Sequence, residues 1–168
     1  VIIHDLELSG NVMGDGRLTK HGAGRLVLGG TNTHRGGLVV AEGVVRLTTN
    51  ADLTALPSIE VRAGALLDVS AQAGWTLGGA QQLEGSGAVT GAVTVASGAH
   101  IAPGGLANAG KLTVTGDLSL LDGSALAMDL AGEAAVGGGT NDLLHVEGDV
   151  SLAGTVTVEV GLLEEAPL

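Results

Sequence analysis

The sequence predicts an all-β fold, a parallel β-helix (β-solenoid) with three short strands per coil, and its composition and residue spacing both lead to that class. Of 168 residues, 45% are hydrophobic and 30 are Gly, but there is one Trp and no Phe or Tyr. A core without aromatic rings must be built from repeated layers of Leu, Val, Ile and Ala. Stacked coils supply such layers, because each inward aliphatic side chain lies about 4.8 Å from its equivalent in the next coil.

The strands are predicted from apolar residues that recur at spacing two in short bursts. Gly interrupts these bursts too often for a stable helix, and the residues between the apolar ones are mostly Glu, Thr, Ser or His, as on a face exposed to water. The clearest segments are residues 6–8, 26–28, 59–61, 93–95, 112–114, 118–120, 144–146, 150–152 and 156–158.

The turns between the strands repeat as well. An apolar residue, two small or polar residues and a Gly recur at intervals of 21, 34 and 25 residues, ending in Gly43, Gly64, Gly98 and Gly123. A Gly at a fixed place in a recurring bend predicts a positive φ there. An irregular repeat of roughly 20 to 30 residues is typical of a solenoid. An antiparallel sandwich would need longer strands and more hairpin dipeptides than Asp15-Gly16 and Asp122-Gly123.

The formal net charge of -11 lies entirely in the second part of the chain. Up to Arg62 six acidic residues balance six basic ones, whereas twelve acidic residues and Lys111 alone follow. Binding to phosphates requires clustered Lys and Arg, so nucleic acid and anionic membranes are poor candidate partners. The absence of Cys excludes disulfides, thiolate metal sites and a Cys nucleophile. No apolar run is long enough for a membrane helix and no leader is evident at Val1, which predicts a soluble fragment or mature chain.

One stretch has a more specific pattern, since residues 20–47 read KHGAGRLVLGGTNTHRGGLVVAEGVVRL. This stretch contains, in order, a basic residue, Gly-x-Gly, Leu-x-Leu, Gly-x-Asn-Thr, a ring, x-Gly, a Val strand, a Gly turn and a Leu strand. In that order it closely resembles the passenger-associated strand repeat of bacterial autotransporters. His34 stands where that family usually has Tyr, and Leu38 where Thr is common. Further blocks follow the family's order at residues 85–91, 101–105, 110–118, 123–130 and 141–148, so the resemblance spans about residues 20 to 160.

The resemblance implies a right-handed parallel β-helix displayed outside a Gram-negative outer membrane. Members of the family carry a separate C-terminal β-barrel that inserts in that membrane and through which the passenger is exported. The expected partners are therefore the chain's own barrel, which this sequence does not contain, and passenger coils upstream. We expect residues 1–168 to be one β-helix segment of a passenger, extracellular or on the cell surface.

The resemblance also suggests what the segment does. Residues 112–160 are dense in aliphatics that we expect to point inward, and in the family the corresponding region has an autochaperone role. The predicted function is a non-catalytic structural stalk whose C-terminal coils nucleate passenger folding during export. One alternative is an adhesin or self-associating module that binds a host surface or an identical passenger. A third possibility is a β-helix enzyme that degrades polysaccharide.

The best catalytic candidates are Asn141 and Asp142, with Asp129 and Asp149 in neighbouring strands. Two carboxylates about 5 to 9 Å apart would suit glycoside hydrolysis. The alternative, which we favour, is a turn over residues 137–142 in which Asn141 and Asp142 bond to their own backbone.

The remaining motifs carry little chemistry. Asp15-Gly16 lacks the serial repeats of calcium-binding β-rolls, and Ser86 lies in a bare turn without a His-Asp pair. Gly104-Gly105 and residues 137–139 precede no helix and are predicted to be bends. Trp75 is predicted to pack beneath a loop rather than to bind a ligand. No zinc site is predicted from the scattered histidines His4, His21, His34, His100 and His145. We therefore predict no catalytic, cofactor-binding or metal-binding residue.

Overall fold

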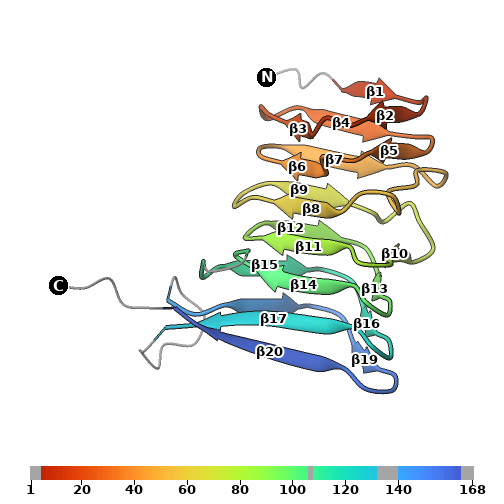
Figure 1. Cartoon of the computed structure of the whole chain (residues 1–168). Coiled ribbons are helices and arrows are strands. Elements are labelled where there is room, and N and C mark those ends of the chain that lie inside the picture. Colours follow the sequence, from red (N-terminus) through yellow and green to blue (C-terminus); the bar gives the residue numbers. More distant parts are fainter. Residues whose placement is uncertain (1–4, 106–107, 132–139, 164–168) are drawn as a thin grey trace.

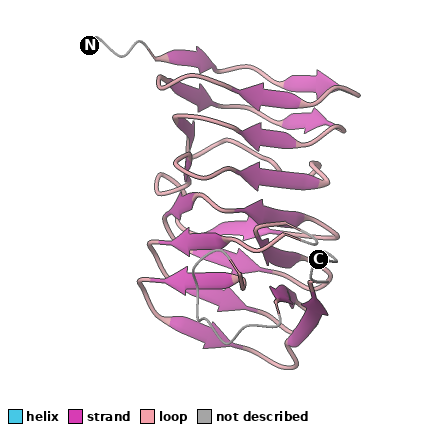
Figure 2. Cartoon of the chain, turned by 90° about the vertical axis from the view of Figure 1, so that its left-hand side faces the viewer, coloured by secondary structure: helices cyan, strands magenta, loops and turns pink. Residues whose placement is uncertain are grey.

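The chain forms a single stack of short strands that runs from its N-terminal to its C-terminal end (Figure 1). The computed structural model describes residues 5–105, 108–131 and 140–163. Within these ranges it contains twenty strands of three to six residues and no helix (Figure 2). Consequently no helix of the described chain is long and apolar enough to cross a membrane.

Two faces of the stack are seven-stranded sheets in which every neighbouring pair is parallel. Sheet 1 contains, in spatial order, β1 (Leu6–Leu8), β4 (Arg25–Leu28), β7 (Val44–Leu47), β9 (Leu66–Asp68), β12 (Ala88–Thr90), β15 (Lys111–Val114) and β18 (Leu143–Val146). Sheet 2 contains β3 (Leu18–Lys20), β6 (Leu38–Val40), β8 (Ser58–Val61), β11 (Gln82–Gly85), β14 (His100–Pro103), β17 (Ala125–Leu130) and β20 (Thr157–Leu162).

The third face is divided between two smaller parallel sheets. Its N-terminal part pairs β2 (Val12–Gly14) with β5 (Asn32–His34). Its C-terminal part, sheet 3, contains β10 (Trp75–Leu77), β13 (Val93–Val95), β16 (Leu118–Leu120) and β19 (Val150–Leu152). Residues 48–57, which lie between β7 and β8, form no strand on this face and contribute one isolated bridge, between Thr31 and Asp52. The prediction of three strands per coil therefore fails for this coil, which has two.

The fold class is confirmed: the chain is an all-β parallel β-solenoid. Each of the nine segments predicted from the sequence overlaps a strand, the last of them shifted so that β20 begins after Val156. The repeated turn glycines have the predicted positive φ, between 68° and 79° at Gly43, Gly64, Gly98 and Gly123. At Gly43 a side chain would also be blocked, because a Cβ would lie 2.4 Å from the carbonyl oxygen of Gly22.

The core consists of aliphatic ladders in which equivalent residues of successive coils stack in register. The first ladder of sheet 1 contains Leu6, Leu26, Val45, Leu67, Val89, Val114 and Val146. Its five central members are buried, and the two end members are more accessible because a coil covers each from one side only. The predicted core of stacked aliphatic layers is thus confirmed, and Trp75 is the one Trp, Phe or Tyr within it.

Burial falls off sharply at the C-terminal end of the stack. Leu112, Val114, Leu118 and Leu120 are buried, but β20 is the last strand of sheet 2, and Val160 on it is 57% exposed. The side chains of β19 are exposed as well. The aliphatic-rich region predicted over residues 112–160 therefore contains a buried part, up to Leu120, and an exposed final coil.

Candidate functional site

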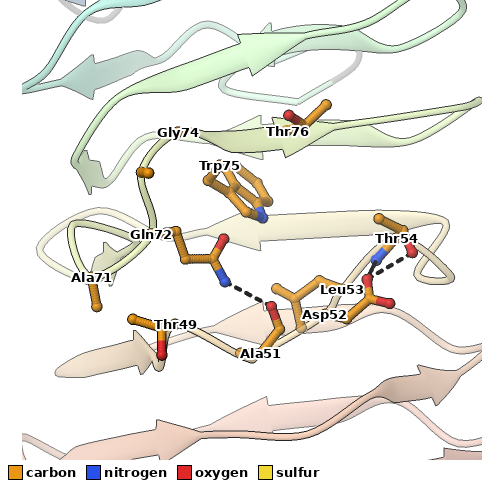
Figure 3. Close-up of a pocket in the computed structure, with 11 residues that line it drawn as sticks. Thr49, Ala51, Asp52, Leu53, Thr54, Ala71, Gln72, Gly74, Trp75 and Thr76 are labelled. Carbon is orange, nitrogen blue, oxygen red and sulfur yellow. Dashed lines mark hydrogen bonds between the residues drawn. The ribbon is translucent and has the colours of Figure 1, made fainter.

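The most distinctive site is a hollow on the third face, where residues 48–57 form no strand. It lies between this segment and residues 71–76, which lead into β10, and has a volume of about 510 Å³ (Figure 3). One part of its wall is apolar and consists of Ala51, Leu53, Ala71, Ala73, Gly74 and Trp75. The other part is polar and consists of Thr49, Asp52, Thr54, Gln72 and Thr76. We call this site the third-face hollow.

Two glutamines replace the missing strand as hydrogen-bond partners. Gln72 Nε2 donates to the carbonyl oxygens of Thr48 (3.1 Å) and Ala51 (2.7 Å), the latter drawn in Figure 3. The buried Gln81 donates through Nε2 to the carbonyl oxygens of Leu53 (2.7 Å) and Leu56 (2.6 Å), and its Oε1 accepts a hydrogen bond from Gly78 N. Because an unpaired buried carbonyl is costly, these amides stabilise the irregular segment.

Asp52 is held in a fixed orientation at the edge of the hollow. Its Oδ1 accepts hydrogen bonds from the backbone N–H and the hydroxyl of Thr54, at 2.8 and 2.7 Å (Figure 3). The same arrangement recurs one coil further on, where Asp68 Oδ1 accepts from the N–H and hydroxyl of Ser70. Of the two carboxylates, only Asp52 lines the hollow.

Trp75 packs in the core, as predicted. It is 4% exposed, starts β10 and lies in register with Val93. In Figure 3 its ring lies beside Gln72 and above the hollow, so its edge forms part of the wall. The sequence predicts that Trp75 packs beneath a loop but does not predict the hollow, because the apolar pattern of residues 48–57 does not differ from that of a strand.

The predicted repeat has a clear structural role at the corner preceding the hollow. Asn32, which is fully buried, donates from Nδ2 to the carbonyl oxygens of Gly29, Gly30 and Asp52, between 3.2 and 3.3 Å. This side chain thereby ties its own turn to the next coil. These hydrogen bonds explain why the repeat has Asn at this position, since a side-chain amide can donate to several carbonyl oxygens at once.

His34, which follows in the same strand, is buried without a hydrogen-bond partner at either ring nitrogen. Burial lowers the pKa of His34 below its ordinary value, and the nearby backbone of Val12 and Gly37 offsets this only partly. The ring therefore occupies an inward position as a neutral, space-filling group.

The acidic candidates of the sequence analysis do not form one cluster. Asp142 is buried, and its carboxylate accepts hydrogen bonds from Gly110 N (2.8 Å) and Asp129 N (2.7 Å). Asp149 lies beyond the far end of β18 and its N–H donates to Asp117 Oδ1. Burial raises the pKa of the Asp142 carboxyl. Asn141 and Asp142 accept hydrogen bonds from the backbone N–H groups of Ala131, Gly110 and Asp129, and residues 137–139 of the predicted turn lie outside the described residues.

The other motifs lie apart from one another. His21 and His145 are exposed, His100 is half-buried, and His4 and residues 137–139 fall outside the described residues. Asp15 is exposed beside Arg35, and Ser86 and Gly104 lie in the turns after β11 and β14. Across the described ranges, no group of three or more His, Cys, Asp and Glu side chains is placed to hold a metal ion.

Comparison with known proteins agrees with the resemblance of residues 20–47. Residues 18–47, from β3 to β7, match the family described as passenger-associated-transport-repeat. A relative described as "Adhesin BmaC autotransporter", from Brucella suis biovar 1 (strain 1330), is 46% identical over 66 residues. That alignment covers 39% of this chain and 2% of the relative. No solved structure gave a significant match.

The chain is therefore a parallel β-solenoid in which residues 18–47 match a repeat of the autotransporter passenger class. That class suggests a location on the cell surface or outside the cell.

Proposed function

We propose that the chain is a non-catalytic stalk segment of an autotransporter passenger and that its C-terminal coils, within residues 112–160, nucleate passenger folding during outer-membrane export. In this proposal the chain's partners are its own translocator barrel, which anchors it at a Gram-negative outer membrane, and the upstream coils that stack on it.

The observation that carries the proposal is the regularity of the coils around β15 and β16. Each has three strands, and Leu112, Val114, Leu118 and Leu120 are all buried at 2% exposure or less. In a stack, stability is roughly a sum of coil terms and nearest-neighbour terms, so folding starts where both are largest and propagates. Each fully buried Leu or Val stabilises by roughly 1.5 to 3 kcal/mol.

Paired truncations test this proposal. A chain of residues 58–168 should refold about as fast as the whole chain, whereas residues 1–110 should refold slowly and stay sensitive to proteinase K. Stopped-flow refolding from urea and timed proteolysis measure the two properties. Fast and complete refolding of residues 1–110 would contradict the nucleation role and leave the stalk role standing.

Adhesion is a second candidate function, favoured by the printed name of the relative and by a row of hydroxyls on sheet 3. Thr76, Thr94, Ser119 and Ser151 lie in register on its outer side, and Ser151 Oγ donates to Ser119 Oγ at 2.9 Å. Purified protein should then bind cultured animal cells saturably in flow cytometry. Binding that rises linearly with concentration would count against adhesion by this segment.

A further inference from the structure

We propose that the third-face hollow binds a neutral oligosaccharide. The proposal deepens the second candidate function, adhesion, by assigning a ligand class to one site, and it is independent of the folding role. The site is formed by residues 48–57 and 71–76. A stalk does not require the irregular conformation of residues 48–57, because the neighbouring coils have an ordinary strand at the same place on the third face.

The dimensions and the mixed lining of the hollow suit a small ligand. Its volume of about 510 Å³ falls within the roughly 300 to 1,000 Å³ of typical ligand sites. Such sites combine apolar walls with a few fixed polar groups. Here the accessible apolar surface comes from Ala71, Ala73 and Gly74, against which the C–H groups of a sugar ring would pack, while the buried Trp75 contributes only an edge.

The polar groups of the hollow favour hydroxyls over charged ligands. No Lys, Arg or His is among its lining residues, so nothing there compensates a phosphate, sulfate or carboxylate. Asp52 is oriented by Thr54 through Oδ1, which leaves Oδ2 as an acceptor for a sugar hydroxyl. A carboxylate oxygen forms stronger hydrogen bonds to hydroxyls than a neutral acceptor does.

The hollow is preorganised because the backbone around it is already satisfied. Gln72 and Gln81 bind the carbonyl oxygens of residues 48–56, so the segment need not rearrange to accept a ligand. A preorganised site loses less conformational entropy on binding.

The hydroxyl row of sheet 3 extends the site along the stack. Thr76 lines the hollow and is the first member of the row, which continues in register through Thr94, Ser119 and Ser151. Strands of a sheet lie about 4.8 Å apart, so the row offers hydroxyls at a regular interval. A glycan that leaves the hollow toward the C-terminal coils would therefore meet further hydrogen-bonding groups.

Trp75 makes the proposal directly testable, since it is the single Trp of a chain without Tyr and it borders the hollow. We would titrate the full chain with maltotriose, cellotriose and triacetylchitotriose, and record Trp emission and heat by isothermal titration calorimetry. At least one trisaccharide should give a saturable change in both signals with a Kd near or below about 1 mM, equivalent to about -4 kcal/mol. Sodium sulfate should give none.

Two variants provide the matched comparison. Asp52→Asn should weaken binding at least tenfold, because the acceptor Oδ2 becomes a donor. Asp68→Asn changes a carboxylate that Ser70 bonds in the same way, that also pairs with Arg46 at 3.6 Å, and that lies outside the hollow, so it should leave the affinity within twofold. Circular dichroism and urea unfolding would establish that both variants fold.

Flat titrations with all three trisaccharides, a saturable response to sulfate alone, or equal loss in both variants would overturn the proposal. Flat titrations together with saturable binding to cells would overturn the glycan site and leave adhesion standing. A third outcome is a trisaccharide response that Asp52→Asn abolishes, together with cell binding that does not saturate. That outcome would support the glycan site and contradict the proposed adhesion function.

Discussion

The coils that follow β10 and the coils that precede it fill the same cross-section with different groups. From β10 onward each coil has a third strand, and the interior beneath sheets 1 and 3 is aliphatic apart from Trp75. Before β10 the third face is interrupted at residues 48–57, and the interior includes Asn32 and His34. Gln81, which follows β10, donates hydrogen bonds to carbonyl oxygens of this interrupted segment. The regular coils from β10 onward are stabilised by stacked aliphatic side chains, whereas the interrupted coil before β10 is stabilised by individual side-chain hydrogen bonds. The regular coils are thus suited to start folding, and the irregular ones to hold a site.

The largest effects should separate the two regions at their buried leucines. Leu112→Ala, inside the regular ladder, should cost about 3 to 5 kcal/mol, because the cavity stays enclosed. Leu53→Ala should cost less, about 2 kcal/mol, because its side chain borders the third-face hollow and water can enter the space. Urea unfolding of both variants measures the difference, and equal costs would mean that the two regions are packed alike.

A smaller effect should reveal the role of the glutamines. Gln81→Leu removes the donor to Leu53 and Leu56 and should cost about 1 to 3 kcal/mol, because buried carbonyl groups lose their partner. Gln82→Leu is the matched control: Gln82 is half-buried and bonds Glu84 in the same strand, so its loss should cost less than about 1 kcal/mol. If Gln81→Leu unfolds at the urea midpoint of the native chain, the irregular coil does not depend on this amide.

The strands could be predicted from the sequence, whereas the hollow could not. Alternation of aliphatic residues fixes a strand locally, as in residues 93–95 and 118–120, and the turn glycines mark the bends. Residues 51, 53 and 56 are also apolar and buried, so their composition does not distinguish a turn from a strand. The amides that stabilise this turn come from Gln72 and Gln81, more than 20 residues away. Pairings over that distance depend on the stacking of whole coils.

The smallest effect concerns pH and again distinguishes the two regions. The pKa of His34 is lowered in the folded chain, so its contribution to stability is present above about pH 6.5 and is lost as the pH falls toward the folded value. The pKa of Asp142 is raised, so its contribution has the opposite sign and decreases as the pH rises from about 4 through the folded value. His34→Tyr should therefore reduce the loss of stability between pH 7.5 and 5.5, measured by urea unfolding. An unchanged loss would show that His34 does not titrate with folding.

The most direct test of C-terminal nucleation uses two valines of one ladder. Val45 in β7 and Val114 in β15 both lie at 0% exposure in sheet 1 and stack in the same row. Replacing either by Ala should destabilise the chain by about 1 to 3 kcal/mol, so the equilibrium effects are comparable. Their kinetic effects should differ: Val114→Ala should slow refolding, and Val45→Ala should mainly speed unfolding. Refolding slowed by Val45→Ala and unaffected by Val114→Ala would contradict nucleation at the C-terminal coils.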